Sequence, residues 1–158
     1  MPAELVLGVI SDTHGLLRPE AVKALRGSDL ILHGGDVGSA YILDELRRIA
    51  PVKAIRGNID SSPWSETLPL TDVIEAGGLS IYMLHDLKQL DLNPAAAGFA
   101  AVICGHSHAP MNEIRNGVLY FNPASAGPRR FRLPICVGKL RISHGNISGE
   151  IIELRLEK

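Results

Sequence analysis

Apolar runs and amphipathic stretches alternate through the first third of the chain. Residues 5–10, 30–33 and 52–55 are largely apolar, which is typical of short strands buried on both faces. Residues 19–26 and 40–49 space their apolar side chains three or four apart and predict helices. Such a β-α-β-α-β order predicts a largely parallel sheet with crossover helices.

From about residue 73 the pattern changes to pairs of strands around tight turns. Gly77-Gly78 separates two strand-like runs. Asn116-Gly117, the strongest short hairpin signal, separates two more. We therefore expect antiparallel pairing in the second half of the chain.

Further elements lie between and after these hairpins. Residues 93–98 predict a short helix and residues 100–104 a buried strand. Residues 135–143 and 150–157 alternate apolar and polar side chains, which predicts a terminal hairpin with one solvated face.

Length and composition fit an ordinary globular protein. A chain of 158 residues can bury one sizeable core, so we expect a single domain over residues 1–158. The net charge of -1 shows no basic excess, and a nucleic-acid polymer is not indicated as a partner. No apolar run approaches the roughly 20 residues of a membrane helix, and the first residues show no secretory signal pattern. We expect a cytoplasmic protein with no membrane partner.

Both cysteines lie within apolar runs. Cys104 and Cys136 share no metal-ligand spacing, so we expect buried thiols rather than a disulfide or a zinc site. Thiols of this kind suit a reducing compartment.

Side chains that can bind metal ions follow five of the expected strands. They are Asp12 and His14, Asp36, Asn58, His85, and His106 with His108. Residues two apart in an extended segment point to the same side, so each Asp-x-His or His-x-His pair can turn two ligands toward one cavity. Carboxylate and imidazole together suit Mn, Fe, Zn or Ni.

Asp36 differs from the other candidates because it follows two glycines and has no neighbouring ligand. Glycines let the backbone and a metal approach closely, so this carboxylate can bridge two ions. Two divalent ions about 3.5–4 Å apart can hold a bridging hydroxide and clamp the oxygens of a phosphoryl displacement. The strand ends supply enough ligands for such a centre.

Taken singly, these motifs have simpler explanations. Asp-x-His after a strand is more often a turn with a capping aspartate, and Gly-Gly-Asp is commonly just a turn. A lone histidine such as His85 is usually a core or surface residue. The placement of all of them directly after apolar strands is what favours a common site.

In order and spacing, these motifs resemble those of the calcineurin-like metallophosphoesterases. The resemblance is to the small bacterial and archaeal phosphodiesterases, which are also similar to the retromer scaffold subunit. The matching segments are Asp12-Thr13-His14, Gly35-Asp36, Gly57-Asn58-Ile59-Asp60, His85, Gly105-His106-Ser107-His108 and Asn122-Pro123-Ala124-Ser125. The resemblance implies an α/β (α+β) fold, a four-layer αββα sandwich in which helices flank two mixed β-sheets.

The resemblance also implies two divalent metal ions per chain, with manganese preferred over nickel, iron, zinc or magnesium. One metal would take Asp12, His14, Asp36 and His108, and the other Asp36, Asn58, His85 and His106. The residues with catalytic roles would be Asp36, Asn58 and His106, with Asp60 as a candidate proton donor.

Three residues depart from the family pattern. Ile59 stands where larger members have a histidine that can protonate the leaving group, so Asp60, water or a good leaving group would have to replace it. Asp86 follows His85 where the small phosphodiesterases usually have glycine, and it narrows the site or adds an acceptor beside a ligand. Ala124 replaces another glycine.

Four further residues carry weaker signals. We expect His33 to support the site from behind and His144 to be a turn residue. Arg129 and Arg130 could meet substrate phosphate, but a solvated loop is the simpler interpretation.

The sequence thus predicts hydrolysis of a small phosphodiester, or a monoester, by a hydroxide that bridges two metals. A catalytically weak or inactive scaffold of the same fold is the alternative, although a scaffold has no need to keep every ligand. A metal-dependent amidohydrolase usually opens with paired histidines, and this chain opens with Asp12-Thr13-His14. The sequence leaves a homodimer open.

Overall fold

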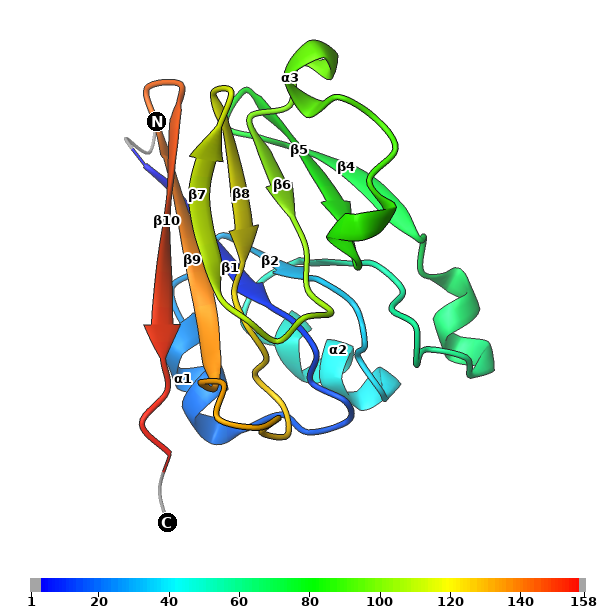
Figure 1. Ribbon diagram of the computed structural model, residues 1–158. Coiled ribbons are helices and arrows are strands. Elements are labelled where there is room, and N and C mark those ends of the chain that lie inside the picture. Colours follow the sequence, from blue (N-terminus) through cyan, green and yellow to red (C-terminus); the bar gives the residue numbers. More distant parts are fainter. Residues whose placement is uncertain (1–3, 157–158) are drawn as a thin grey trace.

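Two five-stranded β-sheets form the centre of the fold in residues 4–156, the part of the chain that the computed structural model describes (Figure 1). The first sheet contains, in spatial order, β10 (Asn146–Glu153), β9 (Cys136–Ser143), β1 (Leu5–Ile10), β2 (Leu30–His33) and β3 (Val52–Ala54). The second contains β4 (Thr71–Ala76), β5 (Leu79–Leu84), β6 (Ala101–Ile103), β8 (Val118–Asn122) and β7 (Met111–Arg115).

Both sheets are mixed, which confirms the expected fold. In the first, β1, β2 and β3 run parallel and β9 is antiparallel to both of its neighbours. In the second, β5, β6 and β8 are parallel, with β4 and β7 antiparallel at the edges. Parallel neighbours need crossover connections, and α1 (Pro19–Leu25) and α2 (Ala40–Arg47) supply those of the first sheet.

Local sequence explains where these two helices begin. Pro19 occupies the first turn of α1, where its missing N–H costs no hydrogen bond. Ser39 caps α2, and its side chain accepts a hydrogen bond from the backbone N–H of Tyr41 at 3.3 Å. Ile42 and Leu46 lie one turn apart and are fully buried, so α2 packs its apolar stripe on the sheet.

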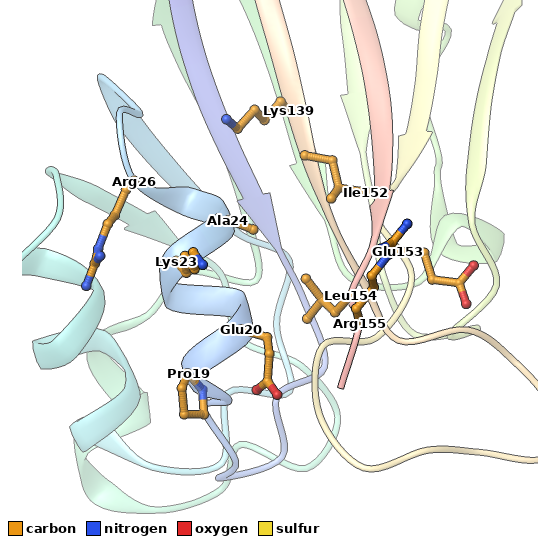
Figure 2. Close-up of a pocket in the computed structure, with 10 residues that line it drawn as sticks. All are labelled: Pro19, Glu20, Lys23, Ala24, Arg26, Lys139, Ile152, Glu153, Leu154 and Arg155. Carbon is orange, nitrogen blue, oxygen red and sulfur yellow. The ribbon is translucent and has the colours of Figure 1, made fainter. Parts of the chain in front are cut away.

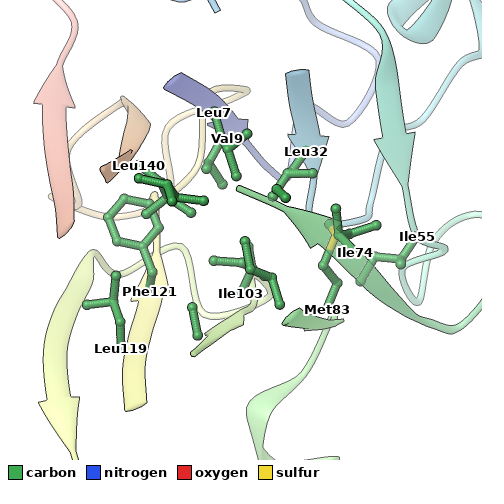
Figure 3. Close-up of a cluster of buried hydrophobic side chains, with 14 residues drawn as sticks. Leu7, Val9, Leu32, Ile55, Ile74, Met83, Ile103, Leu119, Phe121 and Leu140 are labelled. Carbon is green, nitrogen blue, oxygen red and sulfur yellow. The ribbon is translucent and has the colours of Figure 1, made fainter. Parts of the chain in front are cut away.

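Apolar side chains from both sheets fill the space between them. Val9 and Leu32 of the first sheet lie in one cluster with Ile103 and Phe121 of the second (Figure 3). All four are fully buried, and each such side chain contributes about 1.5–3 kcal/mol relative to exposure. This core fixes the two sheets relative to each other.

The outer faces of the two sheets are covered differently. α1 and α2 pack on the first sheet, where Leu25 joins Ile10 and Ile31 in a second buried cluster. On the second sheet, Tyr82 and Val102 are covered by the connection between β5 and β6. The described helices of that connection are only the short 3-10 helix η2 (Leu87–Gln89) and α3 (Pro94–Ala97). The remaining 3-10 helix, η1 (Pro63–Thr67), precedes β4.

The terminal hairpin differs from the sequence prediction. β10 begins at Asn146 rather than Glu150, and Asn146 pairs with Ser143. His144 and Gly145 both have positive φ, 53° and 79°, which makes a two-residue turn whose twist suits a hairpin. The second strand can therefore start directly after the turn.

Two other expectations concern compartment and membranes. Cys104 and Cys136 are free and buried, as predicted. Within residues 4–156, no helix has the length and apolar character needed to span a bilayer.

Candidate metal centre

Strands of both sheets end at a shared loop cluster that contains the seven candidate ligands. β1, β2 and β3 of the first sheet lead to Asp12 and His14, Asp36 and Asn58 respectively. β5 and β6 of the second sheet lead to His85 and to His106 with His108. Ligands in α/β folds bind at the carboxyl ends of strands, and here two sheets contribute such ends.

The first of two ligand groups in residues 4–156 comprises Asp12, His14 and His108. His108 Nε2 lies 3.5 Å from Asp12 Oδ1, and His14 Nε2 lies 3.8 Å from the same oxygen. Asp12 is fully buried and His108 nearly so. One cation could contact all three side chains, because their ligand atoms lie within 4.8 Å of one another.

The second group comprises Asp36, His85 and His106, again with ligand atoms within 4.8 Å of one another. His85 Nε2 lies 3.1 Å from Asp36 Oδ2. His85 Nδ1 lies 2.7 Å from the carbonyl oxygen of Gly34. A carbonyl only accepts, so Nδ1 carries a proton. Burial acts to lower the pKa of His85, but the hydrogen bond to Asp36 and the charge of Asp12 outweigh it and raise this pKa, so Nε2 donates to Asp36 unless a metal ion takes the place of its proton.

The two groups adjoin at the Asp36 carboxylate. Its Oδ2 lies 3.6 Å from His14 Nε2 of the first group, besides the 3.1 Å to His85 Nε2. Asp12 Oδ1 also lies 3.7 Å from His85 Nε2. The Asp36 carboxylate thus contacts histidines of both groups.

Asn58 completes the second group. The end of its amide that faces the cluster lies 3.0 Å from Asp36 Oδ2, 3.1 Å from His85 Nε2 and 3.2 Å from His106 Nδ1. If the amide oxygen of Asn58 occupies this end, its neighbours Asp36, His85 and His106 offer it only acceptor atoms. A cation bound between the amide oxygen and these neighbours would satisfy all of them. With the amide turned over, its NH₂ can donate hydrogen bonds to Asp36 instead.

Unpartnered polar atoms show that the residues present fit a metal ion. Asp12 Oδ1, His14 Nε2 and both ring nitrogens of His108 are buried without a hydrogen-bond partner in the described chain. Buried polar atoms are nearly always paired, and leaving one unpaired costs about 1–3 kcal/mol. Carboxylate oxygens and imidazole nitrogens are the donors that divalent transition metals bind.

The charge states of Asp36 and His14 also suit a metal. Burial acts to raise the pKa of Asp36, but hydrogen bonds from His85 and from the N–H of Ile59 outweigh it and lower this pKa to about 2. Burial lowers the pKa of His14, although Asp36 and Asp12 act in the opposite direction. An ionised carboxylate and a neutral imidazole are the forms that coordinate metals.

Most of the candidate ligands adopt left-handed backbone conformations. Positive φ values occur at Asp12 (55°), His14 (48°), Asp36 (56°), His106 (71°) and His108 (62°). Each such residue costs about 1–2 kcal/mol, and backbone strain of this kind clusters at functional sites. The extended geometry expected for Asp-x-His and His-x-His was therefore wrong, although both pairs do face the cluster.

Asp12 is oriented by contacts to only one of its oxygens. Its Oδ2 accepts hydrogen bonds from Ser11 Oγ at 2.7 Å and from the N–H of His106 at 3.1 Å. Ser125 Oγ also donates to the Asp12 carbonyl at 3.0 Å. No pattern in the sequence identifies Ser11 as a residue that orients Asp12.

His33 ties two ligand loops together, in line with its expected supporting role. The N–H of Gly35 donates to His33 Nδ1 at 3.1 Å, so the proton of the neutral ring is on Nε2. Nε2 lies 3.0 Å from Thr13 Oγ1, whose hydroxyl donates to the Val37 carbonyl at 2.8 Å. Burial lowers the pKa of His33 to about 4. Thr13, between two ligands, thus has a structural task.

Asp60 does not fit the expected role of proton donor. Its Oδ2 accepts hydrogen bonds from the N–H groups of Val37 at 3.1 Å and Gly57 at 3.0 Å. Its Oδ1 accepts from the N–H of Gly38 at 3.0 Å. Both oxygens of this buried carboxylate are acceptors, so Asp60 holds the loops that carry Asp36 and Asn58.

Two cavities border His106. One, of about 460 Å³, is lined by Arg56 and Asp91 together with Asp86 and His106. The other, of about 510 Å³, shares Asp86 and His106 and has Arg130 on its wall. These cavities give a substrate access to the ligand cluster.

A third cavity lies between α1 and the β9–β10 hairpin (Figure 2). Its volume is about 660 Å³, and its wall includes Lys23, Lys139 and Leu154. None of the seven candidate ligands lines it, so we place the candidate site at the cavities beside His106.

Comparison with known proteins shows the family of this chain. Residues 5–145 match the model of the calcineurin-like phosphoesterase superfamily domain. A probable metallophosphoesterase of Methanothermobacter thermautotrophicus is 36% identical to this chain in an alignment of 160 positions. The alignment covers 94% of this chain and 92% of the relative. The chain therefore belongs to the calcineurin-like phosphoesterase superfamily, whose members use divalent metals.

Solved structures share the fold. An archaeal phosphodiesterase has a TM-score of 0.78 and 21% identity, with 94% of this chain and 100% of that chain covered. The Vps29 retromer subunit of Entamoeba histolytica, complexed with Zn²⁺, has a TM-score of 0.71 and 21% identity, with 96% and 100% covered. At these identities the likeness shows the fold alone.

Proposed function

We propose that the protein hydrolyses small phosphodiesters in the cytoplasm with two divalent metal ions, preferably manganese. One ion would be held by Asp12, His14, Asp36 and His108, and the other by Asp36, Asn58, His85 and His106. The observation that carries the proposal is the junction of the two ligand groups at Asp36 Oδ2, 3.6 Å from His14 Nε2 and 3.1 Å from His85 Nε2.

The chain's own residues fix and expose this centre. When bound, two such ions supply an activated water and neutralise charge on the phosphate. Asp12 and Asp36 are buried and held by backbone N–H groups, so their oxygens stay in place. His106 is more exposed and borders both cavities, where it can touch the substrate.

The two cavities support a diester rather than a monoester. A phosphodiester carries a substituent on each side of its phosphorus, and a monoester carries one. Two separate cavities, of about 460 and 510 Å³, border His106, so each substituent can have its own space.

The leaving group has no evident proton donor. Ile59 cannot donate, and the oxygens of Asp60 already accept backbone hydrogen bonds. We therefore propose that protonation comes from water, or that the substrates have good leaving groups.

Metal analysis combined with a turnover assay tests this function. Purified protein should bind two Mn²⁺ per chain and hydrolyse bis(p-nitrophenyl) phosphate. Asp36→Asn and His106→Ala should each reduce kcat at least a hundredfold while the circular dichroism spectrum is unchanged. His144→Ala, at an exposed turn, is the matched control and should retain activity. Full activity after prolonged chelation would sink the proposal.

A scaffold of the same fold is the second candidate. The structural likeness to Vps29 favours it, and that Vps29 is itself complexed with Zn²⁺. Metal binding alone therefore does not separate the two functions, and turnover does. A protein that binds metal but hydrolyses neither diesters nor monoesters would be a scaffold.

A further inference from the structure

The two cavities beside His106 differ in charge. The smaller one has Arg56 with two carboxylates, Asp86 and Asp91, on its wall. The larger one has two cations, Lys88 and Arg130, and only Asp86 as a carboxylate. The larger cavity, where cations outnumber carboxylates, thus favours negatively charged groups, and the smaller cavity does not.

The two cations come from separate parts of the fold. Lys88 lies in η2, directly after β5 and His85, and Arg130 lies in the loop that follows β8. Ser107 and the side chain of Asn122 complete the polar part of the wall, and Asn122 Nδ2 lies 3.1 Å from Ser107 Oγ. The cavity therefore combines two positive charges with neutral polar groups.

Neither cation has an acidic partner. Within residues 4–156, the Lys88 ammonium and the Arg130 guanidinium make no ion pair with a carboxylate. The ion pairs of this region join histidines to Asp12, Asp36 and Asp86. Asp86 is engaged elsewhere, since its Oδ1 accepts from the backbone N–H of Lys88 at 3.1 Å. Both cations are free to bind a ligand.

Adjacent arginines in this loop have different surroundings. Arg129 Nη1 donates to the carbonyl of Leu133 at 3.2 Å and does not line the cavity. Arg130 lines the cavity together with the candidate ligand His106. Arg130 is therefore placed to meet a ligand in the cavity beside His106, while Arg129 closes its own loop.

We propose that the cavity lined by Lys88 and Arg130 is an anion subsite that binds a second phosphate on one arm of the diester. This inference rests on the proposed function and names its substrate class, a phosphodiester with a further phosphate group. A guanidinium fork matches the oxygens of a phosphate, and an ammonium adds a point charge. The metals would hold the scissile phosphate, and the subsite would fix the direction in which the diester lies.

A matched pair of substrates tests the subsite. The p-nitrophenyl ester of thymidine monophosphate has one phosphate, and the same ester with an added phosphate on the sugar has two. With the same leaving group, kcat/KM should be about tenfold higher for the doubly phosphorylated ester, mainly through a lower KM. Lys88→Ala and Arg130→Ala should each bring the ratio of kcat/KM for the doubly phosphorylated ester to kcat/KM for the singly phosphorylated ester toward one. Arg129→Ala is the matched control and should keep the wild-type ratio.

Direct binding gives a readout that does not depend on turnover. Thymidine bisphosphate should bind metal-free wild-type protein about tenfold more tightly than the Arg130→Ala variant in calorimetry, and Arg129→Ala should bind like wild type. Equal affinities for wild type and Arg130→Ala would overturn the subsite. Turnover of both esters with equal kcat/KM would overturn it too, while leaving the proposed function intact. Turnover of neither ester would instead count against the proposed function.

Discussion

Asp12 illustrates how the site keeps a buried carboxylate ready for a metal. One of its oxygens is fully engaged by Ser11 and the N–H of His106, and the other has no partner. The free oxygen faces three imidazoles, those of His14, His85 and His108. Loss of the hydrogen bonds that orient a ligand in this way normally lowers metal affinity by about 10–100-fold.

His33 should make stability pH-dependent. Its pKa of about 4 lies below the ordinary 6.5 of an unfolded histidine, so at low pH the unfolded chain binds a proton that the folded chain does not. The stabilisation is complete above pH 6.5 and is lost as pH falls toward 4, by about 3 kcal/mol in total.

Urea unfolding of the metal-free protein between pH 4 and 7 measures this effect. Replacing the histidine in His33→Gln should flatten the slope over that interval relative to wild type. His144→Gln, at the exposed turn, should leave the slope unchanged. An equal slope in wild type and His33→Gln would show that other groups dominate.

Asp60→Asn separates a structural from a catalytic role. The substitution brings an amide NH₂ toward backbone N–H donors, so the free energy of unfolding should fall by about 1–3 kcal/mol. The dependence of kcat/KM on leaving-group pKa, measured with a series of aryl diesters, should stay as steep as in wild type. A steeper dependence in the variant would restore Asp60 as proton donor.

At the residue scale, the sequence predicts the candidate ligands but not how the chain presents them. The order of motifs after apolar strands is local information, and the structure brings all seven side chains together. Left-handed φ values at Asp12 and His106 could not be predicted, because polar residues rarely adopt them without tertiary support. The role of Asp60 was missed for the same reason, since two of its three partners, Val37 and Gly38, lie over twenty residues away along the chain.

At the level of elements, turn chemistry was the most reliable guide. Asn116-Gly117, with φ values of 50° and 79°, makes the expected hairpin between β7 and β8. The two 3-10 helices, η1 and η2, were not foreseen, because such short elements have no hydrophobic period. η2 matters most, since it carries Lys88 to the cavity beside His106.

The loop after β3 should tolerate no side chain at Gly57. A Cβ at this position would overlap the carboxylate and the backbone nitrogen of Asp36. Gly57→Ala should therefore displace Asp36 and weaken Mn²⁺ binding at least tenfold in calorimetry, with the far-ultraviolet circular dichroism unchanged.

Gly145→Ala is the control for Gly57→Ala. Gly145 has a positive φ of 79° and open space around its Cα, so alanine there costs stability without touching a ligand. Metal affinity should stay at the wild-type value. Comparable affinity in Gly57→Ala would mean that Asp36 is not needed for binding.

For the whole molecule, the centre would link the two sheets. Asp12 and Asp36 follow strands of the first sheet, while His85 and His106 follow strands of the second. An ion bound only by the folded chain stabilises it by about 2.7 kcal/mol at a hundred times Kd. For a domain of this size the gain raises Tm by roughly 5–10 °C.

Thermal unfolding with and without a chelator checks this link. Removing Mn²⁺ with EDTA should lower the Tm of the wild-type protein by roughly 5–10 °C and should have little effect on the Tm of Asp36→Asn. An unchanged Tm in wild type would indicate that the ion does not bind across the sheets.

The pairing of β1 with β9 has a consequence for synthesis. Leu5 pairs with Ile142, so the strand that leads to Asp12 acquires its second neighbour only after almost the whole polypeptide has been made. All seven candidate ligands, by contrast, have emerged by His108. A ribosome-bound chain that stops there would hold every ligand and still leave one edge of β1 open to aggregation, so nascent chains of this protein should need chaperone protection until the last hairpin is released.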